Sequence, residues 1–541
     1  MSMLDSAFTQ PGFRWDEVRA RHLLNRAGFG VPVSAVRRLA AMPPDRAVAA
    51  FVDYETTPDT LPPPDDLPET PDFRTLRRTM EGMSEQERQA LRRKRMGEDR
   101  AAIQGLQRWW LERMCRSQRP LEEKMTLFWH GHFVTSAEKV RDPRQNLEMN
   151  RVLRAHATGG FRSLLGAVAR CPAMLRYLDN MQSTRARPNE NWARELLELF
   201  TLGIGNYTEE DIRAAARAFT GWTVRDGAFH FNERQHDPGT KTFLGRTGPL
   251  DGDDVMDRIL EQPACARHLC GRLWRFFAHD EPEPEIVEGL AATLREGGHQ
   301  MKPVLRRLFS SRAFFSDRVM FSQIKSPAQL TVNLHVLLDV PLPEQPPVAQ
   351  LAMRAMGQDL LYPPNVKGWD GGRAWINTDT LLVRANYAGH LVSGTAPSLG
   401  GRGAGRPAAA MTMRPDEDPP AMRDAPAGQD AMASDIPGRT LAAALRQRRE
   451  EARADRAMRR APFDARAFFA RCEGMTPAEV ADYVTAYFIG RPLEPAARDS
   501  IAAALAPGRD PALPLAVASL AEEDLRGAMQ LLLGMAEFQL C

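Results

Sequence analysis

The stretch from Asn189 to Trp222 reads NENWARELLELFTLGIGNYTEEDIRAAARAFTGW, and its first half decides how the chain is interpreted. On a helical wheel, residues 191–200 have an aromatic and aliphatic side and a polar side. The apolar side carries Trp192, Ala193, Leu196, Leu197, Leu199 and Phe200, and the polar side carries Asn191, Arg194, Glu195 and Glu198. Such a polar face either meets water or lines an internal site, and this choice separates a scaffold from a catalyst.

The composition is that of a globular protein without a general preference for polyanions. Hydrophobic residues make up 43% of the 541 residues and charged residues 26%, which are ordinary proportions for a folded chain. The 71 basic residues nearly balance the 69 acidic ones, which leaves a net charge of +2. We expect no nucleic-acid partner, because the arginine-rich stretch 91–100 also carries acids and is interpreted as a solvated helix face.

Cysteine spacing and the N-terminal residues bear on the compartment. None of the 6 cysteines belongs to a CxxC pair, so we expect neither a disulfide framework nor a thiolate zinc site. The first residues, MSMLDSAFTQPGFRW, lack a basic segment followed by an apolar run. No window approaches the ~18 apolar residues of a membrane span. These features predict a cytoplasmic protein; export together with a signal-bearing partner is the alternative.

Helical periodicity covers most of the chain and predicts a mainly α fold with a large multi-helix body over residues 1–393. Three short segments at 222–224, 228–232 and 242–244 are aromatic or β-branched and are separated by Asp-Gly and Pro-Gly. They predict a small antiparallel sheet of two or three strands near 222–245. Residues 394–438 are rich in Gly, Pro and Ala and predict a disordered insertion. Residues 439–541 are again helical, and we expect them to pack on the main body.

The hexapeptide FWHGHF at 128–133 is the first candidate for chemistry. His130 and His132 point apart on a helix but lie on one face of an extended segment, which a helix break at Gly131 would allow. In that case they could hold a divalent metal ion, with Glu198 as a further ligand. The alternative is that both histidines cap a helix end among aromatic rings.

The polar face of residues 191–200 is the second candidate. Glu195 and Glu198 are i,i+3 neighbours, and Asn191 precedes Glu195 by one helical turn. Paired carboxylates can hold a metal ion, or can differ in pKa and act as acid and base. Arg194 beside them favours the alternative of a structural ion-pair cluster.

The segment HDPGTK at 236–241 is the third candidate. His236, Asp237 and Lys241 would supply a proton shuttle, a carboxylate and a cation on a loop, where functional groups often lie. The alternative is ordinary turn chemistry, because Asp-Pro-Gly favours a turn and Lys241 can neutralise Asp237.

A loop rich in proline, glycine and tryptophan is the fourth candidate. It reads YPPNVKGWDGG at 362–372, and Trp375-Ile376-Asn377 follows shortly after. Trp369 and Asn377, together with Asn191, are candidate binding residues. Tryptophan in such a loop can instead fix the loop onto the core.

Several long motifs occur in order along the chain. They are RHLLNRAGFG (21–30), KMTLFWHGHF (124–133), the opening stretch (189–222), HDPGTKTFLG (236–245), IKSPAQL (324–330), PPNVKGWDGG (363–372) and MQLLLGMAEFQL (529–540). Together they resemble the DUF1800 family, which are large bacterial proteins of unknown function. The resemblance implies no established activity. Because family members often occur beside DUF1501 proteins, similar to the sulfatase/alkaline phosphatase superfamily, it does imply a DUF1501-type partner.

Two functional hypotheses follow. The first is a hydrolytic or metal-assisted enzyme, in which histidines and carboxylates activate water or hold a divalent metal ion and a cation stabilises an anion. Its catalytic residues would be Glu195, Arg194, His236, Asp237 and Lys241. The second is a non-catalytic accessory or scaffold protein that binds a DUF1501-type partner, with the polar groups forming structural networks.

Overall fold

The computed structural model describes residues 2–30, 32–64, 66–68, 78–343, 347–394 and 463–541. The fold is mainly α, as predicted. The predicted insertion, apart from Gly394, and residues 439–462 lie outside the described residues, so the predicted division into body, insertion and C-terminal part stays a prediction.

Helices account for most of the first 220 residues, and their ends follow sequence signals. The long helix α5 begins after a capping box at Ser84 and Glu87, and α6 and α7 begin with proline in the first turn. The helices are α1 (Glu17–Ala27), α2 (Val33–Ala40), α3 (Pro44–Val52), α5 (Glu85–Arg116), α6 (Pro120–His132), α7 (Pro143–Ala155), α8 (Phe161–Arg170), α9 (Pro172–Tyr177), α10 (Glu190–Glu195) and α11 (Glu209–Ala218).

The second part of the chain returns to helices after two β-hairpins. These helices are α12 (Gly252–Leu260), α13 (Pro263–Phe277), α14 (Pro284–Glu296), α15 (Met301–Ser310), α16 (Pro327–Leu338), α17 (Val348–Ala355), α18 (Thr378–Ser393), α20 (Ala465–Phe469), α21 (Pro477–Phe488), α22 (Pro495–Leu505) and α23 (Glu522–Gly534). None of the described helices is long and apolar enough to cross a membrane.

The predicted small sheet is present, but it is two separate hairpins. β1 (Trp222–Arg225) pairs with β2 (Ala228–Phe231), and β3 (Lys241–Phe243) pairs with β4 (Arg246–Gly248), both antiparallel. The third predicted strand, at 242–244, therefore pairs with β4, which lies beyond the predicted sheet region of 222–245. A Leu-Gly turn at 244–245, with positive φ at both residues, closes this second hairpin.

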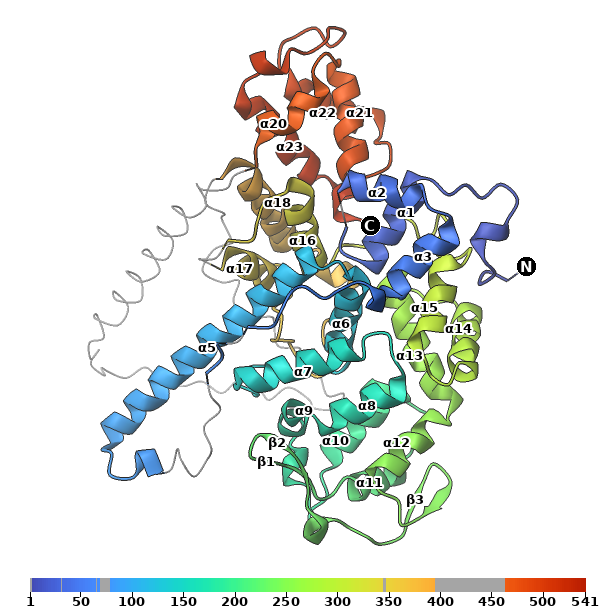
Figure 1. The fold of residues 1–541 in the computed structure, drawn as a ribbon, viewed down its shortest axis with the longest axis vertical. Helices are drawn as coiled ribbons and strands as arrows, with labels where there is room; N and C mark the ends of the chain where they lie inside the picture. Colours follow the sequence, from blue (N-terminus) through green and yellow to red (C-terminus); the bar gives the residue numbers. More distant parts are fainter. Residues whose placement is uncertain (1, 31, 65, 69–77, 344–346, 395–462) are drawn as a thin grey trace, which may run out of the picture.

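Two hydrophobic clusters form the core, and α6 lies between them. One cluster contains side chains of α1–α3 and α7–α15, and the other contains side chains of α5, α16–α18 and α20–α23. α6 contributes Met125 and Trp129 to the first and Leu127 to the second. Figure 1 shows α6 near the middle of the molecule, with α20–α23 at one end of its long axis and the hairpins at the other.

The C-terminal residues pack against the middle of the chain. The Lys325 backbone N–H donates to the Gln539 carbonyl at 2.8 Å, and the Cys541 N–H donates to the Gln323 carbonyl at 2.9 Å. Helix α23 lies against α18, where the Arg526 guanidinium donates to the Val392 carbonyl. The last helices of the chain and those before residue 394 thus share one hydrophobic core.

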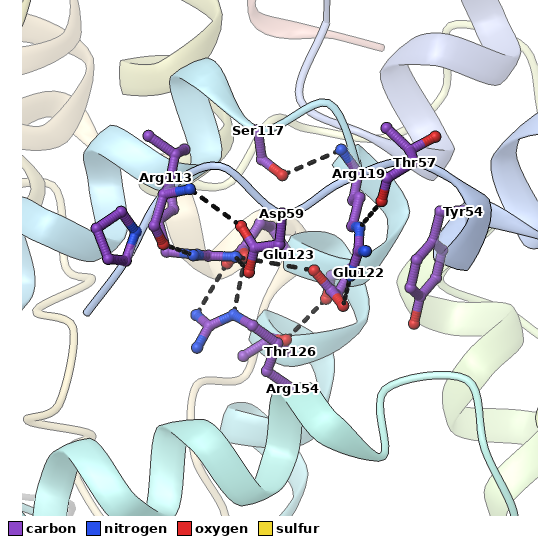
Figure 2. A network of polar contacts seen from close by, with 12 residues as sticks. Tyr54, Thr57, Asp59, Arg113, Ser117, Arg119, Glu122, Glu123, Thr126 and Arg154 are labelled. Carbon is purple, nitrogen blue, oxygen red and sulfur yellow. Dashed lines mark hydrogen bonds and ion pairs between the residues drawn. The ribbon is translucent and has the colours of Figure 1, made fainter.

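A buried ion cluster joins α5, α6 and α7 (Figure 2). The fully buried carboxylate of Glu123 on α6 accepts from Nε of Arg113 at 2.7 Å and from Nε of Arg154 at 2.8 Å. The indole N–H of Trp110 adds a third donor at 3.1 Å. Arg113 also pairs with Asp59 at 2.9 Å, which holds the loop before α5 against the helices.

We predict that Glu123→Gln lowers the free energy of unfolding by about 3–5 kcal/mol, because it leaves two buried guanidinium groups without their shared anion. Urea denaturation followed by tryptophan fluorescence measures the loss. The matched control is Glu98→Gln on the same helix as Arg113, since Glu98 is half-exposed and faces Lys94 at 3.8 Å. Its stability should hardly change. Equal losses in the two variants would contradict a dominant role for the cluster.

Candidate functional site

The turn at 236–241 satisfies its own polar groups. The Asp237 carboxylate binds Arg217 at 2.6 Å and accepts the Gly239 N–H, and the guanidinium holds the pKa of Asp237 below its usual value. The buried Lys241 ammonium donates to the carbonyls of Asp237 and Gly239 at 2.6 and 3.0 Å. His236 Nδ1 lies 2.9 Å from the Thr220 carbonyl. These three predicted catalytic residues thus close a loop.

The two histidines of FWHGHF lie on a continuous helix, because α6 runs through Gly131 to His132. Both are buried, and they serve different neighbours. His130 Nε2 accepts the Leu361 N–H at 3.2 Å, and its ring lies 5.5 Å from that of Trp369. His132 Nε2 lies 2.9 Å from the Phe200 carbonyl. Burial lowers the pKa of His130 to about 4 and that of His132 well below its usual value, so both are neutral at pH 7.

The predicted metal site receives no support from this arrangement. Within the described ranges, no three His, Cys, Asp or Glu side chains come together in a way that could hold a metal ion. His130 and His132 point apart, as residues two apart on a helix must. Each of them binds a backbone group, so His130, His132 and Glu198 do not converge on one point.

The three predicted binding residues have different surroundings. Trp369 packs against His130 and fixes its loop onto α6, which is the structural alternative for that residue. Asn377 is the N-cap of α18 and accepts the Thr380 N–H at 2.8 Å. Asn191 is exposed in the first turn of α10.

The polar face of the opening stretch is partly paired and partly open. Arg194 forms a bidentate ion pair with Glu209 of α11, with both contacts at 2.9 Å. The Tyr207 hydroxyl donates to the Glu198 carboxylate at 3.2 Å. The helix also changes type here. α10 ends at Glu195 and continues as a π-helix over Leu196–Thr201 (η4), so Glu198 lies within a wider turn than predicted.

Glu195 differs from the other acids of this region. It is half-buried, and it makes no hydrogen bond or ion pair with any residue that the structure describes. Burial raises the pKa of its carboxyl group, the Glu198 charge raises it further, and the charges of Lys367 and Arg194 oppose these effects. A carboxyl group with a raised pKa and no fixed partner is a candidate acid–base group.

A surface pocket of about 540 Å³ is lined by Tyr177, which interacts electrostatically with Glu195, although Glu195 is not itself a lining residue. Its walls include Ser136, Glu138, Tyr177, Pro363 and Pro364. Burial raises the pKa of the Tyr177 hydroxyl and the Glu195 charge adds to this, which places the carboxylate near the pocket wall. Lys367 follows the two prolines on the same loop. The pocket has a volume within the range of small-molecule sites.

Tyr177, Lys367 and His268 were not among the residues predicted from the sequence. His268 on α13 lies under the π-helix, with its Nε2 2.9 Å from the Leu199 carbonyl. Lys367 lies in the 362–372 loop, for which the sequence suggested Trp369 as the binding residue. Tyr177 ends a short helix outside the motifs, so no sequence signal could have placed it beside Glu195.

A larger pocket of about 770 Å³ lies where α1, α2, α16, α20 and α21 meet. Arg37, Arg471, Tyr483 and Tyr487 are among its lining residues, and none of the predicted site residues is. Its Glu17 and Arg37 side chains are 53% and 67% exposed and 3.5 Å apart. Because an exposed ion pair of this kind is ordinary surface structure, volume alone does not favour this pocket over the one lined by Tyr177.

Comparison with known proteins gives a family and no activity. No curated protein and no solved structure matches the chain. A family model described as "Protein of unknown function (DUF1800)" matches residues 22–540, which is nearly the whole chain. The predicted resemblance is thereby confirmed, and the chain belongs to the DUF1800 family.

Proposed function

We propose that the protein is a hydrolytic enzyme in which Glu195 is the general acid–base group. One observation carries this proposal: Glu195 is half-buried, with a raised pKa, no hydrogen bond or ion pair to a described residue, and a charge that acts on Tyr177 in the wall of a pocket. The other predicted catalytic residues are held in ion pairs or by backbone groups, so they contribute to the fold of the site or of a distant turn.

The chemistry follows from the surroundings of the carboxyl group. Because its pKa is raised, the Glu195 carboxyl group keeps its proton closer to neutral pH. It can then donate this proton to a leaving group and afterwards accept a proton from water. Lys367 supplies a positive charge that can stabilise a developing negative charge. The Tyr177 ring offers a flat apolar wall for the substrate. Glu195, Lys367 and Tyr177 support this non-metal route, whereas no group of three His, Cys, Asp or Glu side chains among the described residues supports the metal-assisted form.

The accessory or scaffold hypothesis, with a DUF1501-type partner, is the second proposal. It is favoured by the extent to which polar groups are already paired, as in the Arg217–Asp237 turn and the cluster around Glu123. In this proposal the 363–372 loop is a partner surface and the Glu195 carboxylate is not needed for binding. Co-purification of a partner in fixed stoichiometry, unchanged by Glu195→Gln, would favour this proposal over the enzyme.

We predict that two neighbouring substitutions change the acidity of Glu195 in opposite directions. Glu198→Gln removes a negative charge and lowers the pKa of Glu195, whereas Lys367→Met removes a positive charge and raises it. The measurement is the pH dependence of carbodiimide labelling at Glu195, followed by peptide mass spectrometry. Shifts in the same direction would show that the variants act through a general loosening of the site.

We predict that Glu195→Gln reduces hydrolysis by about 10²–10⁴-fold, because a general acid–base group contributes that much. The assay is a panel of p-nitrophenyl esters, glycosides and phosphates, with kcat/KM measured on whichever substrate the wild type cleaves. Glu190→Gln is the matched control, since Glu190 is exposed in the first turn of the same helix. Full activity of Glu195→Gln would reject the proposal.

A further inference from the structure

Two histidines from other helices bind backbone carbonyls at the end of the helix segment that carries Glu195 and Glu198. His268 Nε2 of α13 lies 2.9 Å from the Leu199 carbonyl, and His132 Nε2 of α6 lies 2.9 Å from the Phe200 carbonyl. The rings have centroids 6.1 Å apart. Two consecutive carbonyls at the end of the helix are thus satisfied by side chains that are distant in sequence.

Both histidines act as neutral N–H donors. A carbonyl oxygen can only accept, so each Nε2 carries the hydrogen and each Nδ1 keeps a lone pair. Burial lowers the pKa of His268 to about 4 and that of His132 well below its usual value, and the Arg272 charge lowers both further. His132 Nδ1 is buried without a partner among the described residues. An unsatisfied buried nitrogen costs about 1–3 kcal/mol. The ring nevertheless keeps this orientation, in which its Nε2 donates to the Phe200 carbonyl.

The carbonyls they bind belong to the π-helix. The N–H groups of Leu202 and Gly203 both donate to the Leu197 carbonyl, at 2.9 and 3.1 Å. The Thr201 hydroxyl donates to the Leu196 carbonyl at 2.6 Å. This bonding leaves the carbonyls of residues 199 and 200 without intrahelical donors, and the histidines supply them. Gly203 has φ +79° and leaves room for His268, since a Cβ there would lie 3.0 Å from Nδ1.

We propose that His132 and His268 are positioning residues, which fix the π-turn and thereby the placement of Glu195 and Glu198 against Lys367. This inference rests on the proposed function of Glu195. π-turns within helices often occur at functional sites, and they change which side of the helix later residues occupy. Without the two donors the carbonyls of residues 199 and 200 would be unsatisfied in a dry environment, which favours a return to α-helical bonding. Glu198 would then turn relative to Glu195.

His268 is the better of the two for an experiment, because it is only half-buried whereas substitution of His132 opens the core. His268→Leu removes the donor, and His268→Gln keeps an N–H that can reach the Leu199 carbonyl. His156→Leu is the matched control. His156 Nδ1 lies 2.9 Å from the Val152 carbonyl at the end of α7, so this change removes a comparable contact away from the site.

We predict three results for His268→Leu. Amide hydrogen exchange at Leu202 and Gly203 becomes at least tenfold faster, because the π-turn that presents their shared acceptor, the Leu197 carbonyl, opens more often without the His268 donor. The pH profile of carbodiimide labelling at Glu195 shifts, because Glu198 changes position. On the substrate found for the wild type, kcat falls at least tenfold with little change in KM. In His268→Gln the exchange rates, the labelling profile and kcat stay close to those of the wild type, and His156→Leu changes none of the three.

The inference is overturned if His268→Leu lowers the melting temperature but leaves amide exchange at residues 202–203 and the Glu195 labelling profile unchanged. Failure of the proposed function has a different signature. If Glu195→Gln keeps full activity while His268→Leu still alters exchange and labelling, the histidines hold the π-turn but Glu195 is not the acid–base group.

Discussion

One helix, α6, constrains the structure around it because it is almost fully buried and carries charged and polar side chains as well as apolar ones. All residues of α6 except Pro120 and Gly131 are buried, yet the helix carries two glutamates, a lysine and two histidines. Each buried polar group must find a partner, because an unpaired one costs more than its hydrogen bond would contribute. α5 and α7 supply the arginines for Glu123, the chain after α17 supplies an N–H for His130, and the π-helix supplies a carbonyl for His132. The neighbours of α6 are thus selected by polar matching as well as by apolar packing.

Several of the sequence motifs meet at or near this helix. The Lys124 ammonium of α6 donates to the Gln329 side chain, and Gln329 donates in turn to the Asn25 carbonyl at 2.9 Å. Lys325 donates to Asn333 at 3.0 Å, and Asn333 donates to the Phe29 carbonyl at 3.2 Å. Two lysines, each with its pKa lowered to about 7 by burial, are therefore held by amide side chains that also bind the end of α1. A Cβ at Gly30 would lie 2.0 Å from the Asn333 amide, which explains the glycine in RHLLNRAGFG. These motif residues serve the fold.

The sequence was sufficient for the helices because their signals are local. Proline at the start of α6 and the capping box before α5 mark boundaries that depend on a few adjacent residues. The π-turn after Glu195 was not predictable, since it depends on donors from α6 and α13. The polar face placed Glu195 among the predicted site residues, and its role stays a prediction, whereas Tyr177 and Lys367 come near it only through tertiary packing. The catalytic role of His236 and Lys241 also stays a prediction, and their contacts with backbone carbonyls could not be read from residue types alone.

The lack of a partner for Glu195 among the described residues is informative when it is compared with the ion-paired acids of the structure. Elsewhere the fold recruits a cation or an N–H for its buried acids, as at Glu123 and Asp237. A half-buried carboxyl group without such a partner lowers stability, and a nearby Glu198 lowers it further, yet both lie on a helix whose geometry is held by two buried donors. The adjacent cation, Arg194, does not pair with Glu195 and is turned instead toward Glu209. Proteins retain a destabilising, unpaired carboxyl group mainly where a ligand or a reaction uses that group.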